Sequence, residues 1–381
     1  IEASNAILSD MTQSVPMRRL LPGGVGTGKT IVAILAMLYA IEGGYQCALL
    51  APTEMLARQH FHNINKYLND LNIITNILTS NEKGKYRKQI FENIQNGTTN
   101  IMVGTHAIFN NNVEFYNLGL VIIDEQHRFG VNQRLQLINK GKSPHVLSMT
   151  ATPIPRTIIM SLHGDIDVSS IVEKPIGRKD IITTSLVTDR IPELIAPIRR
   201  VLKRREKVYW VCSLIEDSEV LDYTCVINRY NYLKQYFGAS VDMLHGKMKL
   251  TEKQQVFDKF LIGETSILVS TTVIEVGIDA PDATVMIIEN AERFGLSQLH
   301  QLRGRVGRSD LQSYCVLLHD KEYSNISKQR INVMKNTNDG FIIAEEDLKL
   351  RGGGEINGTK QSGLKKYKTF ESKSTEESKD E

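Results

Sequence analysis

The sequence has few cysteines and no long apolar run. Only four cysteines occur in 381 residues, and no two of them form a C-x-x-C pair. This excludes the usual zinc-finger and redox spacings and indicates reduced, mostly buried thiols in a cytosolic protein. No apolar run approaches the roughly 20 residues of a membrane-spanning helix, so we expect no membrane partner.

Neither sign of charge is in excess. There are 46 Lys and Arg residues against 43 Asp and Glu residues, for a net charge of +3. This balance permits a nucleic-acid partner without requiring one, because a basic groove can lie within a nearly neutral total. With 41% hydrophobic residues, the chain is expected to be globular and, by its length, to contain two or three domains.

The chain starts at Ile1, without a Met and without the charged-then-apolar layout of a signal peptide. We expect it to be a piece of a longer protein, so a missing targeting peptide says little about that parent. A bacterial cytoplasmic location is the expectation, with organellar targeting left open.

Short apolar strands alternate with helical patterns in two successive stretches. The first predicts strands at 18–21, 47–51, 73–78, 100–103, 120–123 and 146–149, with helices at 29–41 and 54–67. After a turn-rich segment at 172–180 the pattern restarts, with strands at 181–187, 207–211, 240–244, 266–269, 284–288 and 313–318 and helices at 192–204 and 249–261. This alternation predicts an α/β fold of two tandem parallel-sheet lobes. We place lobe 1 at 1–174, lobe 2 at 175–324, a mostly helical segment at 325–363 and a polar, disordered tail at 364–381.

A glycine-rich motif lies between a predicted strand and a predicted helix. Residues 23–30 read GGVGTGKT, which fits the phosphate-loop motif G-x-x-x-x-G-K-T in its proper context. We expect Lys29 to reach the β- and γ-phosphates of ATP and Thr30 to bind Mg²⁺. A glycine-rich turn with a stray lysine is the alternative. Backbone N–H groups are expected to face phosphate oxygens at the glycines of the loop, Gly23, Gly26 and Gly28.

Two carboxylates follow the strongly apolar strand at 120–123. Because ligands sit at the carboxyl ends of strands in open parallel sheets, we expect Asp124 to hold Mg²⁺, partly through water, and Glu125 to polarise the attacking water. The alternative is a solvated acidic pair at a strand end. At the tip of the next strand, the hydroxyls of Thr150 and Thr152 are expected to link the nucleotide site to a bound nucleic-acid strand.

Arginines in the second stretch suit the same nucleotide. The motif QLRGRVGR at 301–308 carries Arg305 and Arg308, which we expect to stabilise the γ-phosphate from the second lobe. A generic basic helix face is the alternative, and we place Gln301 in the nucleotide site as well. If lobe 1 holds Lys29 and lobe 2 supplies arginine, full stabilisation requires a closed cleft, which ATP favours and hydrolysis releases.

A further loop of the second stretch, residues 271–279, reads TTVIEVGID. Thr271 and Thr272 are expected to hold a DNA phosphate, and Gly277 and Asp279 to face the nucleotide. A plain connection between two strands of the sheet is the alternative.

Together these motifs resemble those of the RecG family of superfamily 2 DNA helicases, which have two RecA-like lobes. The resemblance runs from about residue 17 to residue 363. The transcription-repair coupling factor family shares much of the pattern but usually reads Asp-Glu-Glu-His where this chain has Asp-Glu-Gln-His at 124–127. The segment YWVCSLIE at 209–216 also favours RecG. The motifs that carry the resemblance are APTE at 51–54, GTH at 104–106, DEQH at 124–127, TATPIPRT at 150–157 and QLHQLRGRVGR at 298–308.

The RecG resemblance implies an ATP-dependent translocase or helicase of double-stranded DNA that acts on stalled forks and Holliday junctions in recombination and repair. It also implies a helical hairpin and loop at 347–363 that passes lobe movement to DNA, with Arg351 and Gln361 as key members. Because the chain starts just before the phosphate loop, we expect it to lack the wedge domain with which the family splits forks. Gly24 stands in place of the family's usual acidic residue, and Gly353 and Asn357 in place of its proline and leucine.

Expected DNA contacts, independent of base sequence and sensitive to salt, are Arg58, Thr105 and His106 together with the two threonines at 271–272. A basic run at 83–88 is explained equally well as a solvated helix face. Three alternatives stay open: a translocase like the transcription-repair coupling factor, an RNA helicase of the same superfamily, and a truncated, non-catalytic nucleotide- or DNA-binding remnant. We expect a monomer.

Overall fold

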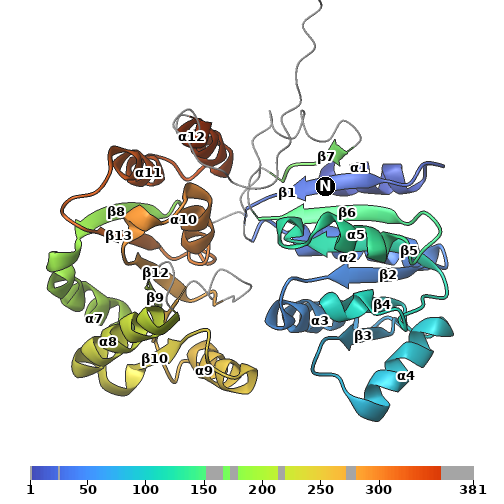
Figure 1. Ribbon diagram of the computed structural model, residues 1–381, viewed down its shortest axis with the longest axis horizontal. Helices are drawn as coiled ribbons and strands as arrows, with labels where there is room; N and C mark the ends of the chain where they lie inside the picture. The colour runs from blue at the N-terminus through green and yellow to red at the C-terminus, as the bar shows by residue number, and fades with distance from the viewer. Residues whose placement is uncertain are drawn as a thin grey trace, which may run out of the picture.

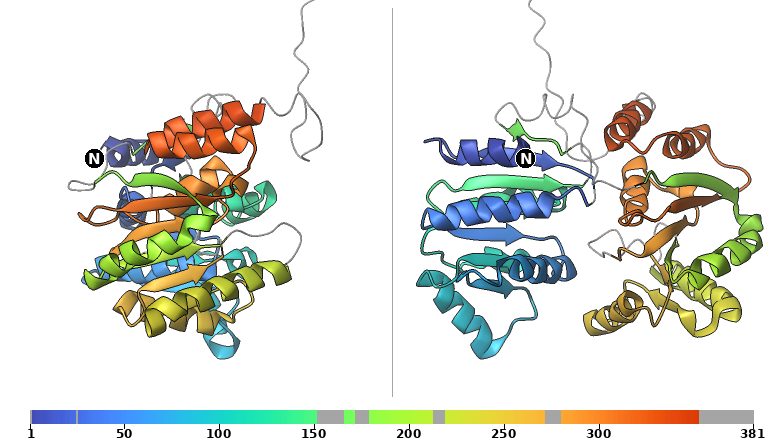
Figure 2. Two further views of the ribbon diagram at one scale, coloured as in Figure 1. Left: turned by 90° about the vertical axis from the view of Figure 1, so that its left-hand side faces the viewer. Right: turned by 180° about the vertical axis from the view of Figure 1, so that it is seen from behind.

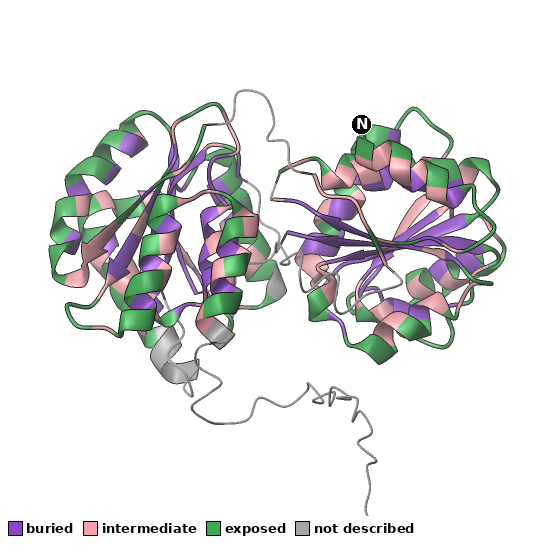
Figure 3. Ribbon diagram, turned by 90° about the horizontal axis from the view of Figure 1, so that it is seen from above, coloured by how far each residue is buried: buried purple, intermediate pink, exposed green. Residues whose placement is uncertain are grey.

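Two α/β lobes form the molecule (Figure 1). The computed structural model describes residues 2–24, 26–151, 166–171, 179–212, 219–271 and 280–352. Strands rich in Val, Ile and Leu are buried in the middle of each lobe, between helices whose outer faces are exposed (Figure 3). Within these ranges, no helix combines the length and the apolar character needed to cross a bilayer.

Lobe 1 contains a seven-stranded parallel sheet with the order β3-β4-β2-β5-β6-β1-β7. Helices α1, α2 and α3 bury side chains such as Met37 and Ile64 against one face, while α4 and α5 bury Ile90 and Leu137 against the other. The strands are β1 (Arg18–Pro22), β2 (Gln46–Leu50), β3 (Thr75–Leu78), β4 (Ile101–Gly104), β5 (Leu118–Asp124), β6 (His145–Thr150) and β7 (Asp167–Val168). The helices are α1 (Glu2–Met11), α2 (Lys29–Glu42), α3 (Glu54–Leu68), α4 (Gly84–Gln95) and α5 (Val131–Ile138), with short 3₁₀ turns η1 (His106–Phe109) and η2 (Gln126–Arg128).

Lobe 2 contains a six-stranded parallel sheet with the order β10-β11-β9-β12-β13-β8. Its strands are β8 (Ile182–Val187), β9 (Lys207–Val211), β10 (Val241–Leu244), β11 (Ile267–Ser270), β12 (Ala283–Ile288) and β13 (Tyr314–His319). Its helices are α7 (Ile195–Lys203), α8 (Glu219–Phe237), α9 (Leu250–Ile262), α10 (Leu296–Arg303), α11 (Asn325–Asn336) and α12 (Gly340–Gly352), with 3₁₀ turns η3 (Thr188–Leu194), η4 (Gly238–Ser240) and η6 (Ala291–Arg293). Helices α11 and α12 lie together at one end of the lobe (Figure 2).

The two lobes repeat one topology. When β1 to β6 are matched in chain order with β8 to β13, the strand orders of the two sheets coincide, and β7 is the extra edge strand of lobe 1. The repeat extends to the turn at the carboxyl end of the central strand. Residues 124–137 read DEQHRFGVNQRLQL and residues 289–302 read ENAERFGLSQLHQL, with Arg-Phe-Gly at the same place in both.

The backbone of these two turns is also the same. Glu125 and Asn290 both adopt the left-handed conformation, each with φ of 49°. A 3₁₀ turn follows in both lobes, and then an eight-residue helix, α5 or α10. The N–H of Gly130 donates to Gln133 at 3.1 Å, and that of Gly295 donates to Gln298 at 3.2 Å. The same local interactions therefore build the turn after β5 in lobe 1 and the turn after β12 in lobe 2.

The predicted alternation of strands and helices is confirmed. Each predicted strand is present, with ends within two residues of those observed. The helix predicted at 192–204 begins later, at Ile195, because Pro192 lies in the 3₁₀ turn η3. The sequence-based prediction omitted α4, α5, α8, α10 and β7. Cysteines 47, 212 and 315 are buried and free. The lobe boundary at 172–178 and the tail at 364–381 lie outside the described residues.

A buried arginine fastens α11 to lobe 2. Arg303, at the end of α10, is only 2% exposed. Its Nη1 donates to the carbonyls of Met334 at 2.7 Å and Thr337 at 2.9 Å, and to Thr183 Oγ1 at 3.3 Å. The two carbonyls lie at the C-terminal end of α11, where a helix leaves acceptors without partners of its own. One guanidinium therefore joins the helix that ends in the Arg-Gly-Arg motif to the helical pair that follows lobe 2.

Replacing Arg303 with Ala should destabilise lobe 2. The substitution removes the donor from two buried acceptors and one partly buried acceptor and opens a cavity, which together should lower the free energy of unfolding by roughly 2–4 kcal/mol. Urea unfolding monitored by the fluorescence of Trp210, which is buried in lobe 2, measures this change. Arg199→Ala, at an exposed position of α7, is the control. Equal midpoints for the two variants would contradict the assignment.

Candidate nucleotide-binding site

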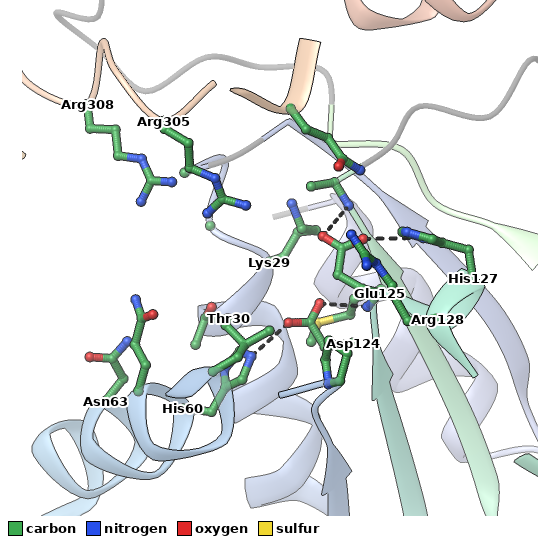
Figure 4. A pocket seen from close by; sticks show the side chains of 18 residues that line it. Lys29, Thr30, His60, Asn63, Asp124, Glu125, His127, Arg128, Arg305 and Arg308 are labelled. Carbon is green, nitrogen blue, oxygen red and sulfur yellow. Dashed lines mark hydrogen bonds and ion pairs between the residues drawn. The ribbon is translucent and has the colours of Figure 1, made fainter. Parts of the chain in front are cut away.

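A cavity of about 180 Å³ lies between the two lobes (Figure 4). It contains side chains from the glycine-rich loop, from α3, from the end of β5 and from the segment after α10. It brings together the predicted catalytic residues of both lobes. Its lining residues include Gly26, Gly28, Lys29, Thr30, Gln59, His60, Asn63, Asp124, Glu125, His127, Arg128, Gln301, Arg305 and Arg308.

The glycine-rich loop turns sharply into α2. Gly28 is the N-cap of that helix and has φ of 93°, a left-handed conformation that other residues adopt only at a cost. At Gly23, a Cβ would approach Thr27 Oγ1 to 2.8 Å, so the loop also needs glycine there for space. Backbone N–H groups at the start of a helix form an anion site, which is what the sequence predicts here.

Lys29 points into the centre of this loop. Its Nζ donates to the carbonyls of Gly23 at 2.5 Å and Gly24 at 2.8 Å. Burial lowers the pKa of Lys29 to about 8. Asp124 and Glu125 oppose this shift, whereas the arginines of lobe 2 add to it. A buried ammonium that donates to two backbone carbonyls is well suited to an anionic ligand, which would favour its charged form.

Asp124 is held through both of its carboxylate oxygens. Its Oδ2 lies 2.8 Å from His60 Nε2, and its Oδ1 accepts the backbone N–H of Glu125 at 3.1 Å. Burial alone would raise the pKa of Asp124, but the hydrogen bond and charge of His60, together with the charge of Lys29, keep it below the usual value. The group is therefore an anion whose orientation is fixed.

Glu125 has the opposite electrostatic environment. Burial and the neighbouring charge of Asp124 raise the pKa of the Glu125 carboxyl, and Lys29 offsets only part of this. Its oxygens accept the backbone N–H of Ala151 at 3.3 Å and the hydroxyl of Thr150 at 3.4 Å. A carboxylate with a raised pKa is a better general base. The same contacts join it to the tip of β6, where the sequence predicts a link to the bound strand.

Lobe 2 contributes positive charge to the cavity. Arg305 and Arg308 point toward Lys29 from the segment after α10 (Figure 4), and both affect the pKa of Lys29 electrostatically. Arg305 is 7% exposed. Gln301, which we placed in this site from sequence, also lines the cavity. Lysine and arginines thus face one space from opposite lobes.

The cavity offers oxygen atoms to a divalent cation, from the Thr30 hydroxyl and the Asp124 carboxylate. Mg²⁺ prefers oxygen ligands and usually binds through one or two carboxylates plus phosphates of the substrate. In the part of the chain that the structure describes, no group of three or more His, Cys, Asp or Glu side chains could hold a metal alone. The residues present therefore suit a cation that arrives with a phosphate ligand.

The residues predicted to bind DNA lie in different surroundings. Arg58 is half exposed on α3, with its Nη2 2.7 Å from Glu54 Oε1 and 2.9 Å from Glu82 Oε1. Two carboxylates thus compensate its charge. Thr271, at the end of β11, is only 4% exposed. The phosphate contacts of both residues stay predictions.

Thr105 and His106 directly follow β4, at the carboxyl edge of the lobe 1 sheet. His106 packs against the rings of Phe109 and Phe129, at centroid distances of 5.8 Å and 5.3 Å. Phe129 belongs to the turn that begins at Asp124, so this loop packs against the turn that carries Asp124 and Glu125. Arg351 lies in the last turn of α12. The remaining predicted residues, Thr152, Thr272, Gly277, Asp279 and Gln361, lie outside the described residues.

Some lining residues were missed from sequence. Gln59, His60 and Asn63 reach the cavity from one side of α3. Asn63 lies three residues after His60 and four after Gln59, and both spacings bring side chains together on a helix, so the spacing was a usable signal. His127 and Arg128 also line the cavity. They lie in the predicted Asp-Glu-Gln-His motif or directly after it, but no role had been given to them.

Three family profiles match the sequence. They are described as "DEAD/DEAH box helicase", at residues 4–160, "Helicase conserved C-terminal domain", at 190–310, and "ATP-dependent DNA helicase RecG, domain 3, C-terminal", at 337–379. The third match includes most of the segment predicted to be a disordered tail.

Curated relatives share about half of this sequence. The chain is 51% identical over 362 residues to ATP-dependent DNA helicase RecG of Synechocystis, which covers 94% of this chain and 43% of that protein. It is 48% identical to the RecG helicase of Bacillus subtilis, covering 95% of this chain and 53% of that protein. The chain therefore spans about half the length of the curated relatives it matches.

Solved structures agree with these relatives. A RecG bound to a three-way DNA junction is similar at a TM-score of 0.77 and 41% identity, covering 94% of this chain and 48% of that one. The yeast protein Dbp5, solved with RNA and ADP BeF3, is similar at a TM-score of 0.67 but only 16% identity, so it shares the fold alone.

Nucleotide affinity is expected to fall above about pH 8. The pKa of Lys29 is about 8 in the folded protein, so its ammonium is present below that pH and lost as the pH rises through it. Titration of a fluorescent ADP analogue on both sides of pH 8 measures the effect. Lys29→Arg keeps its charge over this range, so its affinity, whatever its absolute value, should vary little. A flat wild-type profile would contradict the assignment.

Two glycines of the loop should respond oppositely to Ala. Gly28 is left-handed, so Gly28→Ala should destabilise the protein by about 1–2 kcal/mol through backbone strain alone. Gly24 has no positive φ, and its Cβ would meet only Thr27 Cγ2, at 3.5 Å. Gly24→Ala should therefore stabilise by about 0.4–1 kcal/mol, through the unfolded chain. Melting temperatures that shift in the same direction would count against this.

Proposed function

We propose that this chain, whose lobes are those of the RecG family of ATP-dependent DNA helicases, is an ATPase that moves along double-stranded DNA. It would act at branched junctions such as stalled forks and Holliday junctions, in recombination and repair. One observation carries the proposal: Lys29 of lobe 1 and Arg305 and Arg308 of lobe 2 line a single cavity. ATP would be the ligand gripped from both sides.

The side chains divide the work of hydrolysis. Lys29 would exchange its two loop carbonyls for phosphate oxygens. Glu125, with its raised pKa, would accept a proton from the attacking water. Arg305 and Arg308 would stabilise the negative charge that spreads over the transferred phosphoryl group. Mg²⁺, held by Thr30 and Asp124, would supply charge neutralisation between the phosphates.

Movement would follow from the need for both lobes. The arginines assist only when the cleft is closed, so ATP favours closure, and loss of the γ-phosphate releases it. Contacts of Glu125 with Thr150 and Ala151 supply a path from the nucleotide to β6. Through Arg303, closure would also carry α11 and α12, the start of the segment that the RecG resemblance assigns to duplex DNA.

The choice of DNA rests on the relatives. RecG helicases match at 47–51% identity over nearly the whole chain, whereas the RNA-bound Dbp5 shares only the fold. This favours DNA over RNA and RecG over the transcription-repair coupling factor. A non-catalytic remnant is disfavoured because lysine, both acids and both arginines share one cavity. We further propose that the chain acts as a monomer in the bacterial cytoplasm.

Branched DNA should stimulate ATP hydrolysis by this chain. The experiment compares phosphate release with forked, duplex and single-stranded DNA and with RNA, and also without nucleic acid. Branched or duplex DNA should give the highest rate, and Lys29→Ala should abolish it. Lys203→Ala, an exposed lysine of α7, should match the wild type. Equal rates with and without DNA would contradict the proposal, and a preference for RNA would favour the RNA helicase alternative.

A further inference from the structure

His60 contacts the carboxylate that we assign to Mg²⁺. It lies on α3, and its Nε2 is 2.8 Å from Asp124 Oδ2. Both side chains are nearly buried, with 8% and 11% of their surface exposed. The cavity wall includes both residues, and Figure 4 shows the imidazole beneath the carboxylate. The roles proposed for Lys29, Glu125, Arg305 and Arg308 in hydrolysis do not involve this histidine.

The hydrogen bond has a defined direction. An ionised carboxylate can only accept, so the imidazole carries its hydrogen on Nε2. Within the described residues, His60 Nδ1 has no hydrogen-bond partner. The other oxygen of Asp124 already accepts the N–H of Glu125. One donor on each oxygen fixes the carboxylate plane and leaves further lone pairs of both oxygens for a cation or its water ligands.

The repeat in lobe 2 shows the same tether with a different donor. Glu289 follows β12, as Asp124 ends β5, and Arg229 of α8 reaches it, as His60 of α3 reaches Asp124. Arg229 Nε and Nη2 lie 2.5 Å and 3.2 Å from the two oxygens of Glu289, and Trp210 Nε1 also donates to it. In lobe 2 an arginine therefore contacts both oxygens of the carboxylate and neutralises its charge.

The two lobes differ in the donor that contacts the carboxylate, which is an imidazole in lobe 1 and a guanidinium in lobe 2. A guanidinium occupies both oxygens of a carboxylate and cancels its charge. An imidazole donates a single hydrogen bond to one oxygen. In lobe 1, which has the phosphate loop, the single hydrogen bond from His60 orients the Asp124 carboxylate and leaves lone pairs of its oxygens for other ligands. Packing alone would not require a donor to the carboxylate on the corresponding helix of both lobes.

We propose that His60 is a positioning residue that holds the Asp124 carboxylate in the orientation required by Mg²⁺ bound to the nucleotide. The inference rests on the proposed function, since it takes the cavity to bind Mg²⁺ and ATP. This role would also couple the position of α3 to the metal ligand Asp124. This helix starts in the Ala-Pro-Thr-Glu segment and carries Arg58, a predicted DNA contact, so a shift of α3 would reach the metal ligand directly.

The test measures how Mg²⁺ changes the affinity for a fluorescent ADP analogue, so it needs no turnover. His60→Gln places an amide N–H near the position of Nε2, whereas the shorter His60→Asn cannot reach Asp124. His60→Asn should raise the Mg²⁺ concentration for half-maximal effect by about 10- to 100-fold and leave the affinity in EDTA unchanged. His60→Gln should stay close to the wild type. His62→Asn, on the exposed face of α3, is the matched control.

Each outcome decides between the interpretations. Loss of the Mg²⁺ response in Asn but not in Gln supports a positioning hydrogen bond. A wild-type response in both variants, or an equal loss in both, overturns it. Loss of nucleotide affinity in EDTA in both variants also overturns it, because His60 then acts through packing. A wild-type chain without any Mg²⁺-dependent nucleotide binding would instead refute the proposed function itself.

Discussion

Charge buried between the lobes is the constraint on which the rest of the structure depends. One ammonium, three guanidinium groups and two carboxylates line a small cavity. Burial disfavours the charged form of Lys29 and of Glu125, as their pKa shifts show. Cations outnumber the carboxylates in this space, so an anionic ligand would balance the charge. Because the cations come from separate lobes, that compensation is complete only when both lobes are in place.

The sequence was sufficient for the scaffold and for the most specific motifs. Apolar runs buried on both faces are easy to recognise, as is GGVGTGKT between a strand and a helix. The spacing of Gln59, His60 and Asn63 could indicate a shared helix face, but not the contact of His60 with Asp124, which exists only because α3 packs near the end of β5. Nor could the sequence reveal that the carboxylates of Glu54 and Glu82 engage Arg58. Contacts between distant elements depend on packing that no local pattern encodes.

The two lobes show how one scaffold serves two purposes. Their sheets share one strand order, and their central turns share one backbone. What differs is the chemistry at equivalent points. The first lobe has an aspartate held by histidine, and the second has a glutamate that is neutralised by arginine and accepts a hydrogen bond from tryptophan. The second lobe instead adds Arg305 and Arg308 to the cavity, from the segment that follows α10.

The paired left-handed residues point to a trade-off between robustness and chemistry. Asn290 tolerates this backbone cheaply, because asparagine visits the left-handed region more readily than other non-glycine residues. Glu125 has no such ease, and strained positions of this kind cost about 1–3 kcal/mol. Lobe 2, which carries no phosphate loop, has at this point a residue that suits the left-handed backbone. Lobe 1 has a carboxylate there instead, so the conformation that brings Glu125 to the cavity carries a local cost in thermal stability.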